Sequence, residues 1–412
     1  MDFRDTREDA QYRARVRAFL DQHAKLEAPD SGRGYRDGND DPKALERARH
    51  WQRIKAEAGF AGITWPKHFG GQGGSQLQHI IYEQEEARYD VPRGNFFYIG
   101  LGWAMPTLFV YATQDEVLKH AVKVLRGDEI WCQLFSEPAG GSDLAALRTK
   151  AVRKDDEWII NGQKTWTSGG QYSDFGVLVA RNDAAQAKHK GLTCFILDMK
   201  SPGVEVRPIR QMSGDSHFNE VYFNDVRVTD SRRLGEVGDG WKVAMTTLMN
   251  ERYNLVDLPP PDFEQIFHLV SNTTLPSGPA LEDPAIREKL ADLWCRAQGM
   301  KYTNFRTMSA LSQGKTPGPE VSIGKLVASG RLQETANLGS DLFGESGLLL
   351  EPEMPQTALF QRAYLYSPGW RLGGGTDEIL RNTIAERVLG LPADIRADKG
   401  VAFKDIPTGK RG

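Results

Sequence analysis

The sequence predicts an α+β protein in three parts: helices first, then an antiparallel β-barrel or β-sandwich, then a helical bundle. Apolar residues recur at helical spacing before residue 127 and after residue 235, and at a spacing of two between them. No Gly-x-Gly-x-x-Gly segment follows a strand and opens a helix, which disfavours a parallel dinucleotide-binding sheet. We therefore expect an all-helical domain at 1–126, a β domain at 127–235, a helical bundle at 236–393 and an extended tail at 394–412.

The composition is that of a globular protein, with 412 residues, 40% of them apolar and 26% charged. The 52 Lys and Arg residues nearly balance the 55 Asp and Glu residues, which argues against nucleic-acid binding. Cys132, Cys194 and Cys295 are too few and too scattered for a disulfide framework. The first 20 residues are charged throughout, and no run approaches the about 18 apolar residues of a membrane span. We expect a cytoplasmic protein without a membrane span.

The first part begins with an amphipathic pattern in which Tyr12, Val16, Phe19 and Leu20 share one stripe. Helical patterns recur in WQRIKAEAGF, HIIYEQEEARYD, FFYIGLGWAMPTLFVYA and QDEVLKHAVKVL, and the Gly- and Pro-rich GITWPKHFGGQGGS interrupts them as a loop. The helical period returns after residue 240. The Pro-rich segment 258–283 is expected to be a loop or a loose insertion.

The middle part is rich in short strands. Apolar residues alternate in IWCQLF, EWIIN, FGVLVAR, LTCFILDM, VEVRPI and NEVYFNDVRV, each bounded by Gly, Asn, Asp or Pro. Because no helices alternate with these strands, an antiparallel arrangement is expected.

Two segments of the middle part carry polar groups suited to a ligand. Gly140, Gly141 and Ser142 follow a strand, so their N–H groups and hydroxyl could cradle a phosphate, or the segment could be a plain turn. In NGQKTWTSGG, Asn161-Gly162 predicts a hairpin turn. There Trp166 precedes two hydroxyl groups, which would suit an aromatic cofactor, although a single Trp is more often a core residue.

In combination, these segments resemble the acyl-CoA dehydrogenase family of flavoproteins. The resemblance runs through GITWPKHFGG, RGDEIW, SEPAGGSD, NGQKTWTS, FNEVYFNDVRV, GDGWKVAM and GGTDEILRNTIAERVLGLP, in that order. It implies a C-terminal four-helix bundle and FAD bound between the β domain and that bundle. It also implies an acyl-CoA substrate of lipid metabolism and fatty-acid β-oxidation, electron-transferring flavoprotein as the electron acceptor, and a dimer or tetramer.

The resemblance also implies roles for individual positions. Residues 133–136 match those that line the pyrimidine side of the flavin ring, and Ser168 matches the hydroxyl that bonds flavin N5. Gly141 and Ser142 match the turn that meets the FAD pyrophosphate and the acyl-CoA. The residues matched to FAD are Gln133, Leu134, Phe135, Ser136, Gly141, Ser142, Trp166, Thr167, Ser168, Thr376 and Glu378.

The catalytic carboxylate is not at its most common place in the family, because Gly374 stands there. The sequence instead resembles the isovaleryl and long-chain branch, which takes the base from the first helix of the C-terminal domain, just before an Arg. Glu251 followed by Arg252 occupies that place, so Glu251 is the implied base, with an ordinary ion-paired helical Glu as the alternative. Burial beside substrate and flavin is expected to raise its pKa. Ser142, Arg252 and the N–H of Gly374 are the implied substrate contacts.

Two departures from the family pattern leave alternatives open. An Arg-x-x-Phe-Gly motif is absent, and the usual Gly-Gly-Asn-Gly turn is FGESG at 343–347. The chain could therefore be a FAD-poor or non-catalytic partner subunit of a hetero-oligomer. A separate alternative is a flavin monooxygenase of the same fold, which would lack a placed carboxylate base, so Glu251 argues against it. The three glycines at 373–375 favour a bulky acyl group or serve only a tight turn. No metal site is expected from the histidine spacing.

Overall fold

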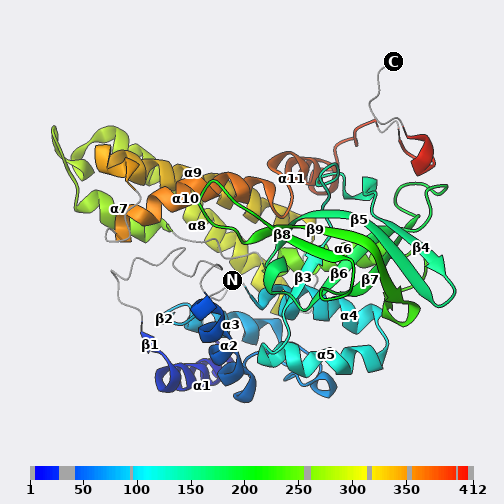
Figure 1. The fold of residues 1–412 in the computed structure, drawn as a ribbon. Helices are drawn as coiled ribbons and strands as arrows, with labels where there is room; N and C mark the ends of the chain where they lie inside the picture. The colour runs from blue at the N-terminus through cyan, green and yellow to red at the C-terminus, as the bar shows by residue number, and fades with distance from the viewer. Residues whose placement is uncertain are drawn as a thin grey trace. The chain divides into compact units, whose positions relative to one another are not determined.

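A computed structural model describes residues 5–26, 42–92, 96–254, 261–312, 318–349, 355–395 and 398–406 (Figure 1). The chain forms two compact units. We call residues 37–74, 92–253 and 394–412 the sheet unit, and residues 1–36, 75–91 and 254–393 the bundle unit.

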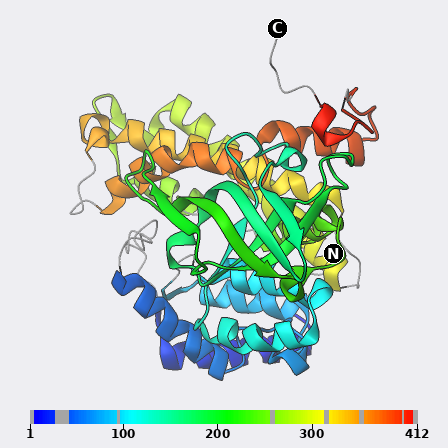
Figure 2. The same ribbon diagram turned by 45° about the vertical axis from the view of Figure 1, so that its right-hand side comes forward.

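The sheet unit contains one eight-stranded sheet. The path runs β10-β7-β6-β4-β5-β9-β8, and β3 pairs with β6. The sheet is the group of green arrows in Figure 2. Most pairs are antiparallel, whereas β3–β6 and the single-residue β4–β6 contact are parallel. The strands are β3 (Trp131–Leu134), β4 (Lys150–Lys154), β5 (Glu157–Ser168), β6 (Phe175–Arg181), β7 (Leu192–Asp198), β8 (Val204–Ile209), β9 (Phe218–Thr229) and β10 (Arg233–Leu234).

Strands β6 and β7 are buried on both faces, which explains their nearly continuous apolar sequences. On β6, Val177 and Val179 belong to a core shared with helices, whereas Leu178 and Ala180 belong to a second core among the strands. The same alternation on β7 places Cys194 in the first core. The helices on the first core are α4 (Met105–Tyr111), α5 (Gln114–Arg126) and α6 (Gly240–Asn254).

Two further helical segments of the sheet unit are α2 (Pro42–Glu57) and a π-helix, η2 (Ile99–Ala104), which leads directly into α4. Helix α5 is bounded by the side-chain cap of Thr113 and by Gly127, whose φ of 72° is the left-handed conformation that ends a helix. Near the end of the chain, a short 3-10 helix, η10 (Phe403–Asp405), belongs to the same unit.

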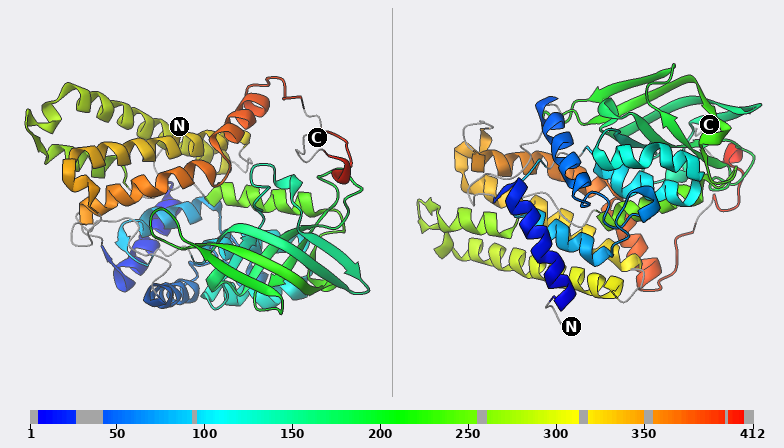
Figure 3. Two further views of the ribbon diagram at one scale, coloured as in Figure 1. Left: turned by 45° about the horizontal axis from the view of Figure 1, so that its top comes forward. Right: turned by 90° about the horizontal axis from the view of Figure 1, so that it is seen from below.

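The bundle unit contains the long helices α8 (Pro284–Ser312), α9 (Ser322–Leu342) and α10 (Pro355–Leu372), which pack side by side (Figure 3). Helix α7 (Phe263–Ser271) packs with these three around an apolar core that includes Ile266, Leu293 and Phe360. The unit also contains the helices α1 (Arg7–His23), α3 (Gln76–Glu86) and α11 (Asp377–Thr383). Two short antiparallel strand pairs belong to it: β1 (Lys25–Leu26) pairs with β2 (Tyr89–Asp90), and β11 (Thr274–Leu275) pairs with β12 (Gly278–Pro279).

Two expectations about local structure were wrong. The segment 258–283 is not a loop throughout, because it contains α7 and the β11–β12 hairpin. Asp262 and Gln265 form a capping box that starts α7 once the prolines have passed. Asn161-Gly162 is not a hairpin turn but a bulge inside β5, where the register with β9 shifts. The hairpin that joins β4 to β5 turns at Asp155, whose φ is 55°.

Two further findings concern only the described part of the chain. None of its helices combines the length and the apolar character needed to cross a bilayer. It also contains no cluster of three or more His, Cys, Asp or Glu side chains that could hold a metal ion.

Candidate active site

The loop after β3 presents hydrogen-bond donors to solvent. Gly141 and Ser142 are exposed, and a side chain added at Gly141 would meet nothing within 4 Å. Within the described part of the chain, the N–H groups of Gly141 and Ser142 make no hydrogen bond, and the Ser142 hydroxyl makes none either. Two free N–H groups and a hydroxyl in an exposed turn suit a phosphate group.

A buried ion pair fixes this loop to strand β5. Lys164 is fully buried, and its Nζ donates to Glu137 Oε1 at 2.8 Å and to the Phe135 carbonyl at 2.9 Å. Glu137 also accepts the N–H groups of Arg148 and Thr149 at 2.6 and 2.9 Å. Burial alone would raise the pKa of Glu137, but the charge and hydrogen bond of Lys164 lower it.

Residues 133–136 link β3 to this ion pair. The Gln133 and Ser136 side chains are half-buried, whereas those of Leu134 and Phe135 are buried. The Ser136 carbonyl accepts the N–H of Thr165 at 2.9 Å. The loop motif and the β5 motif are therefore joined by backbone and side-chain bonds.

Strand β5 presents Trp166 on its surface through a strained backbone. The register between β5 and β9 shifts between Lys164 and Thr167, and Trp166 has a φ of 57°, which is rare for a bulky residue. The Trp166 side chain is 58% exposed and meets Phe218 edge-on at 5.8 Å between ring centroids. Thr167 is buried beside it. Such strain at an exposed ring is typical of functional sites.

Helix α6 carries Glu251, which is only 9% exposed. Hydroxyl pairs fix α6 against α4: Thr107 Oγ1 lies 2.9 Å from Thr247 Oγ1, and Tyr111 Oη lies 3.0 Å from Thr246 Oγ1. Arg252 lies on the same helix, but its side chain is outside the described residues.

Tyr98 interacts with both Ser168 and the charge of Glu251, and sequence reasoning missed it. It directly precedes η2, packs edge-on against Trp103 at 4.9 Å between centroids, and is hydrogen-bonded to the Ser168 side chain. Burial raises its pKa to about 12, and the nearby charge of Glu251 acts in the same direction. The Tyr98 hydroxyl is therefore protonated at neutral pH. Tyr98 lies in an apolar run with a helical pattern, so the sequence did not indicate that it belongs to the site.

The remaining predicted residues belong to the bundle unit. Gly374 has a φ of 67° in the turn before α11, and the Thr376 side chain caps α11 by accepting the N–H of Ile379. Lys325 Nζ donates to the Gly375 carbonyl at 2.6 Å and so ties this turn to α9. Glu378 is exposed. The position of these residues relative to Glu251 stays a prediction.

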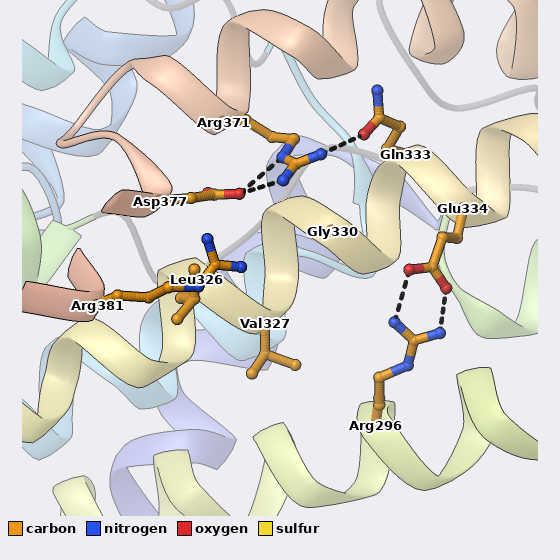
Figure 4. Close-up of a pocket in the computed structure, with 9 residues that line it drawn as sticks. All are labelled: Arg296, Leu326, Val327, Gly330, Gln333, Glu334, Arg371, Asp377 and Arg381. Atoms are coloured by element: carbon orange, nitrogen blue, oxygen red, sulfur yellow. Dashed lines mark hydrogen bonds and ion pairs between the residues drawn. The ribbon is translucent and has the colours of Figure 1, made fainter. Parts of the chain in front are cut away.

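A pocket of about 290 Å³ opens in the bundle unit beside this turn (Figure 4). Its charged lining consists of two ion pairs and one further cation: Arg371 Nε lies 2.8 Å from Asp377, Arg296 Nη1 lies 3.0 Å from Glu334, and Arg381 extends between them. None of the predicted site residues lines this pocket.

The sheet unit fits the expected half of a FAD site in its donor chemistry. It offers an exposed aromatic face at Trp166, a hydroxyl at Ser168 and an open turn with free donors at Gly141 and Ser142. A cofactor with a flat ring and a pyrophosphate needs an aromatic face with a hydroxyl for the ring and free donors for the phosphates.

Models of the N-terminal, middle and C-terminal domains of acyl-CoA dehydrogenases match residues 6–128, 132–226 and 238–389. The chain belongs to the acyl-CoA dehydrogenase family and is an enzyme of the oxidoreductase class. The predicted order of helices, sheet and helices is confirmed.

Similarity to individual proteins extends over most of the chain. Acyl-CoA dehydrogenase IpdE1 of Mycolicibacterium smegmatis is 36% identical over 370 residues, which cover 86% of this chain and 91% of that protein. The solved structure of the Tcur3481-Tcur3483 steroid ACAD has a TM-score of 0.79 and 27% identity, covering 96% of this chain and all of that one. The ChsE4-ChsE5 complex from Mycobacterium tuberculosis has a TM-score of 0.77 and 26% identity, with 96% and 100% covered.

Proposed function

We propose that the chain is a FAD-dependent acyl-CoA dehydrogenase in which Glu251 removes the α-proton of an acyl-CoA. The observation that carries this proposal is the buried carboxylate of Glu251, whose charge acts on Tyr98, which in turn is hydrogen-bonded to Ser168. The proton acceptor and the hydroxyl assigned to the flavin thus both act on the same tyrosine. A surface glutamate with a structural role would not need this arrangement.

The residues of the site have separate roles. The carboxylate of Glu251 takes the proton from the α-carbon as the β-hydrogen leaves with its electron pair. Bound FAD would supply the acceptor for that hydride. Ser168 would hold the flavin near N5 through its hydroxyl, and Tyr98 fixes that hydroxyl. Trp166 would flank the ring, and its exposed side chain is consistent with this role.

The loop of Gly141 and Ser142 would bind the phosphate groups of FAD and the acyl-CoA. Its free N–H groups support this assignment. From the bundle unit, the N–H of Gly374 would bind the thioester carbonyl and acidify the α-proton, and Thr376 and Glu378 would contact the cofactor. Arg252 would fix the substrate end of the site.

The substrate class and partners follow from the relatives. One of the similar structures is named as a steroid enzyme, which supports a bulky acyl group in lipid metabolism over a short straight chain. One similar structure is named as a complex of ChsE4 and ChsE5 and another carries the paired name Tcur3481-Tcur3483, which supports a hetero-oligomer. We propose electron-transferring flavoprotein as the acceptor and the cytoplasm as the location.

The test is anaerobic bleaching of the flavin absorbance by straight-chain, branched and steroid-derived acyl-CoAs. Glu251→Gln should keep its FAD and lower the rate of bleaching about a hundredfold or more. Glu236→Gln is the control, because Glu236 lies before the same helix with its side chain 87% exposed. Undiminished bleaching in Glu251→Gln would exclude Glu251 as the base. A purified chain without flavin would favour the partner-subunit alternative.

A further inference from the structure

A segment near the end of the described chain lies against the β6–β7 connection of the sheet unit, where the red 3-10 helix η10 is drawn in Figure 1. The N–H groups of Phe403 and Lys404 donate to the carbonyls of Gln186 and Ala184 at 2.8 and 2.9 Å. Ala402 forms a β-bridge with Ala187. We call residues 398–405 the C-terminal strap.

The Phe403 ring of the strap covers Arg181. The centre of the Arg181 guanidinium lies 3.5 Å from the ring centroid. Beneath that ring, Arg181 donates to the Leu147 carbonyl at 3.0 Å and to the Ala145 carbonyl at 2.6 Å. Burial lowers the pKa of Arg181 to about 10, so its guanidinium keeps its charge at neutral pH. The covered cation therefore holds the segment that immediately follows Gly141 and Ser142.

Lys188 joins the strap to the same loop from the other side. Its Nζ lies 2.9 Å from Asp143, the residue after Ser142, and also contacts Asp398 of the strap. The Lys188 side chain is 12% exposed and those of Asp398 and Asp143 are 25% and 56% exposed. Partial burial strengthens such a pair relative to one in bulk water.

We propose that the C-terminal strap and Lys188 are positioning elements of the acyl-CoA site, which hold the Gly141–Ser142 loop in its binding conformation. The loop makes few contacts of its own, since Gly141 has open space around it and both residues are exposed. The Glu137–Lys164 pair holds the loop on its N-terminal side, and the contacts at residues 143 and 145–147 hold it on its C-terminal side. A loop that is already ordered loses less conformational freedom when it binds a phosphate. This inference rests on the proposed role of Gly141 and Ser142.

The test uses two variants of the full chain with its FAD. Asp398→Asn removes one carboxylate from Lys188, and Phe403→Leu removes the ring over Arg181. Hydrogen exchange of the 139–149 backbone and the Kd of coenzyme A are measured for each, followed by kcat and KM with the best acyl-CoA. Lys404→Ala is the matched control, because it lies on the same 3-10 helix and is exposed, with no described side-chain contact. Asp398→Glu should restore the wild-type values.

Exchange of the 139–149 backbone should quicken, and the Kd of coenzyme A and KM should rise about fivefold, with kcat within about twofold of wild type. Unchanged exchange in both variants, or faster exchange with an unchanged Kd, would overturn the proposed role of the strap. If Phe403→Leu does not fold, Asp398→Asn decides. Measuring exchange and the Kd of coenzyme A needs no turnover. An absence of flavin bleaching would therefore overturn the proposed function and leave the role of the strap to be decided by these two measurements.

Discussion

The buried pair of Glu137 and Lys164 gives the sharpest prediction about the site. Lys164→Met removes an ammonium group that is fully buried and bonded to Glu137 at 2.8 Å. Glu137→Gln keeps the shape but removes the countercharge. Breaking a buried pair by removing one partner costs about 3–5 kcal/mol, because the other charge stays buried. Each single variant should therefore lower the free energy of unfolding by an amount in that range.

The two variants should differ in a way that the contacts determine. After Lys164→Met, Glu137 still accepts two backbone N–H groups, from Arg148 and Thr149. After Glu137→Gln, Lys164 keeps the Phe135 carbonyl and a weaker amide oxygen, while the amide NH₂ faces the N–H of Arg148, so two donors meet and that N–H loses its acceptor. Glu137→Gln should thus be the more damaging change. The double variant should be less damaging than the sum, with a coupling of about 2 kcal/mol.

Urea unfolding of the apo-protein measures these energies, and titration of apo-protein with FAD measures the consequence for the site. FAD affinity should fall in both single variants, because the pair joins the loop motif to the strand that carries Trp166. Lys200→Ala, which breaks an exposed pair with Asp174 on the same unit, is the control and should change stability by less than about 1 kcal/mol. Single effects below about 1 kcal/mol, or strict additivity, would refute the argument.

Two further predictions concern pH. Burial would raise the pKa of Glu85, but hydrogen bonds from three arginines lower this pKa from 4.5 to about 2. The Glu85 carboxylate therefore contributes about 3 kcal/mol of stability above pH 4.5, which is lost as pH falls toward 2. Glu85→Gln should remove this contribution to acid sensitivity in unfolding measurements. Burial raises the pKa of Tyr98 to about 12, so Tyr98 contributes stability that is lost as pH rises from 10 to 12, and Tyr98→Phe should make that loss smaller. Tyr98→Phe should also slow flavin bleaching about fivefold, since one hydrogen bond to Ser168 is lost, and an unchanged rate would contradict the role of Tyr98.

Much of the fold could be predicted because its signals are local. Alternation of side chains reports which face of a strand is buried, and β6 and β7 were recognisable from apolar runs alone. The segments around Ser142 and Trp166 could be singled out because glycines, hydroxyls and an aromatic residue are unusual together. Helix α7 was missed because the prolines dominate the insertion, although Asp262, Gln265 and the apolar run FEQIFHLV were a readable start signal.

The missed parts of the site depend on contacts between distant positions. Tyr98 and Ser168 are 70 positions apart, and a π-helix has no sequence period by which η2 could have been recognised. Lys164 and Glu137 both lie in recognised motifs, yet nothing local indicates that they pair. The contact of Lys188 with Asp398 spans even more of the chain. Charged residues read from a sequence are expected at the surface, so a buried pair is found only in the structure.

These contacts share one physical arrangement. The residues assigned to the ligand, such as Trp166 and Ser142, are exposed or strained and so contribute little to stability. The buried polar groups that hold them, Lys164 and Arg181, have no assigned contact with the ligand. A positive φ at Trp166 persists only because the surrounding structure determines it, and the neighbouring Lys164 anchor is part of that structure. It follows that loss of Lys164 should relax the backbone at Trp166 before the sheet unfolds, so FAD binding should be lost at lower urea than the sheet itself.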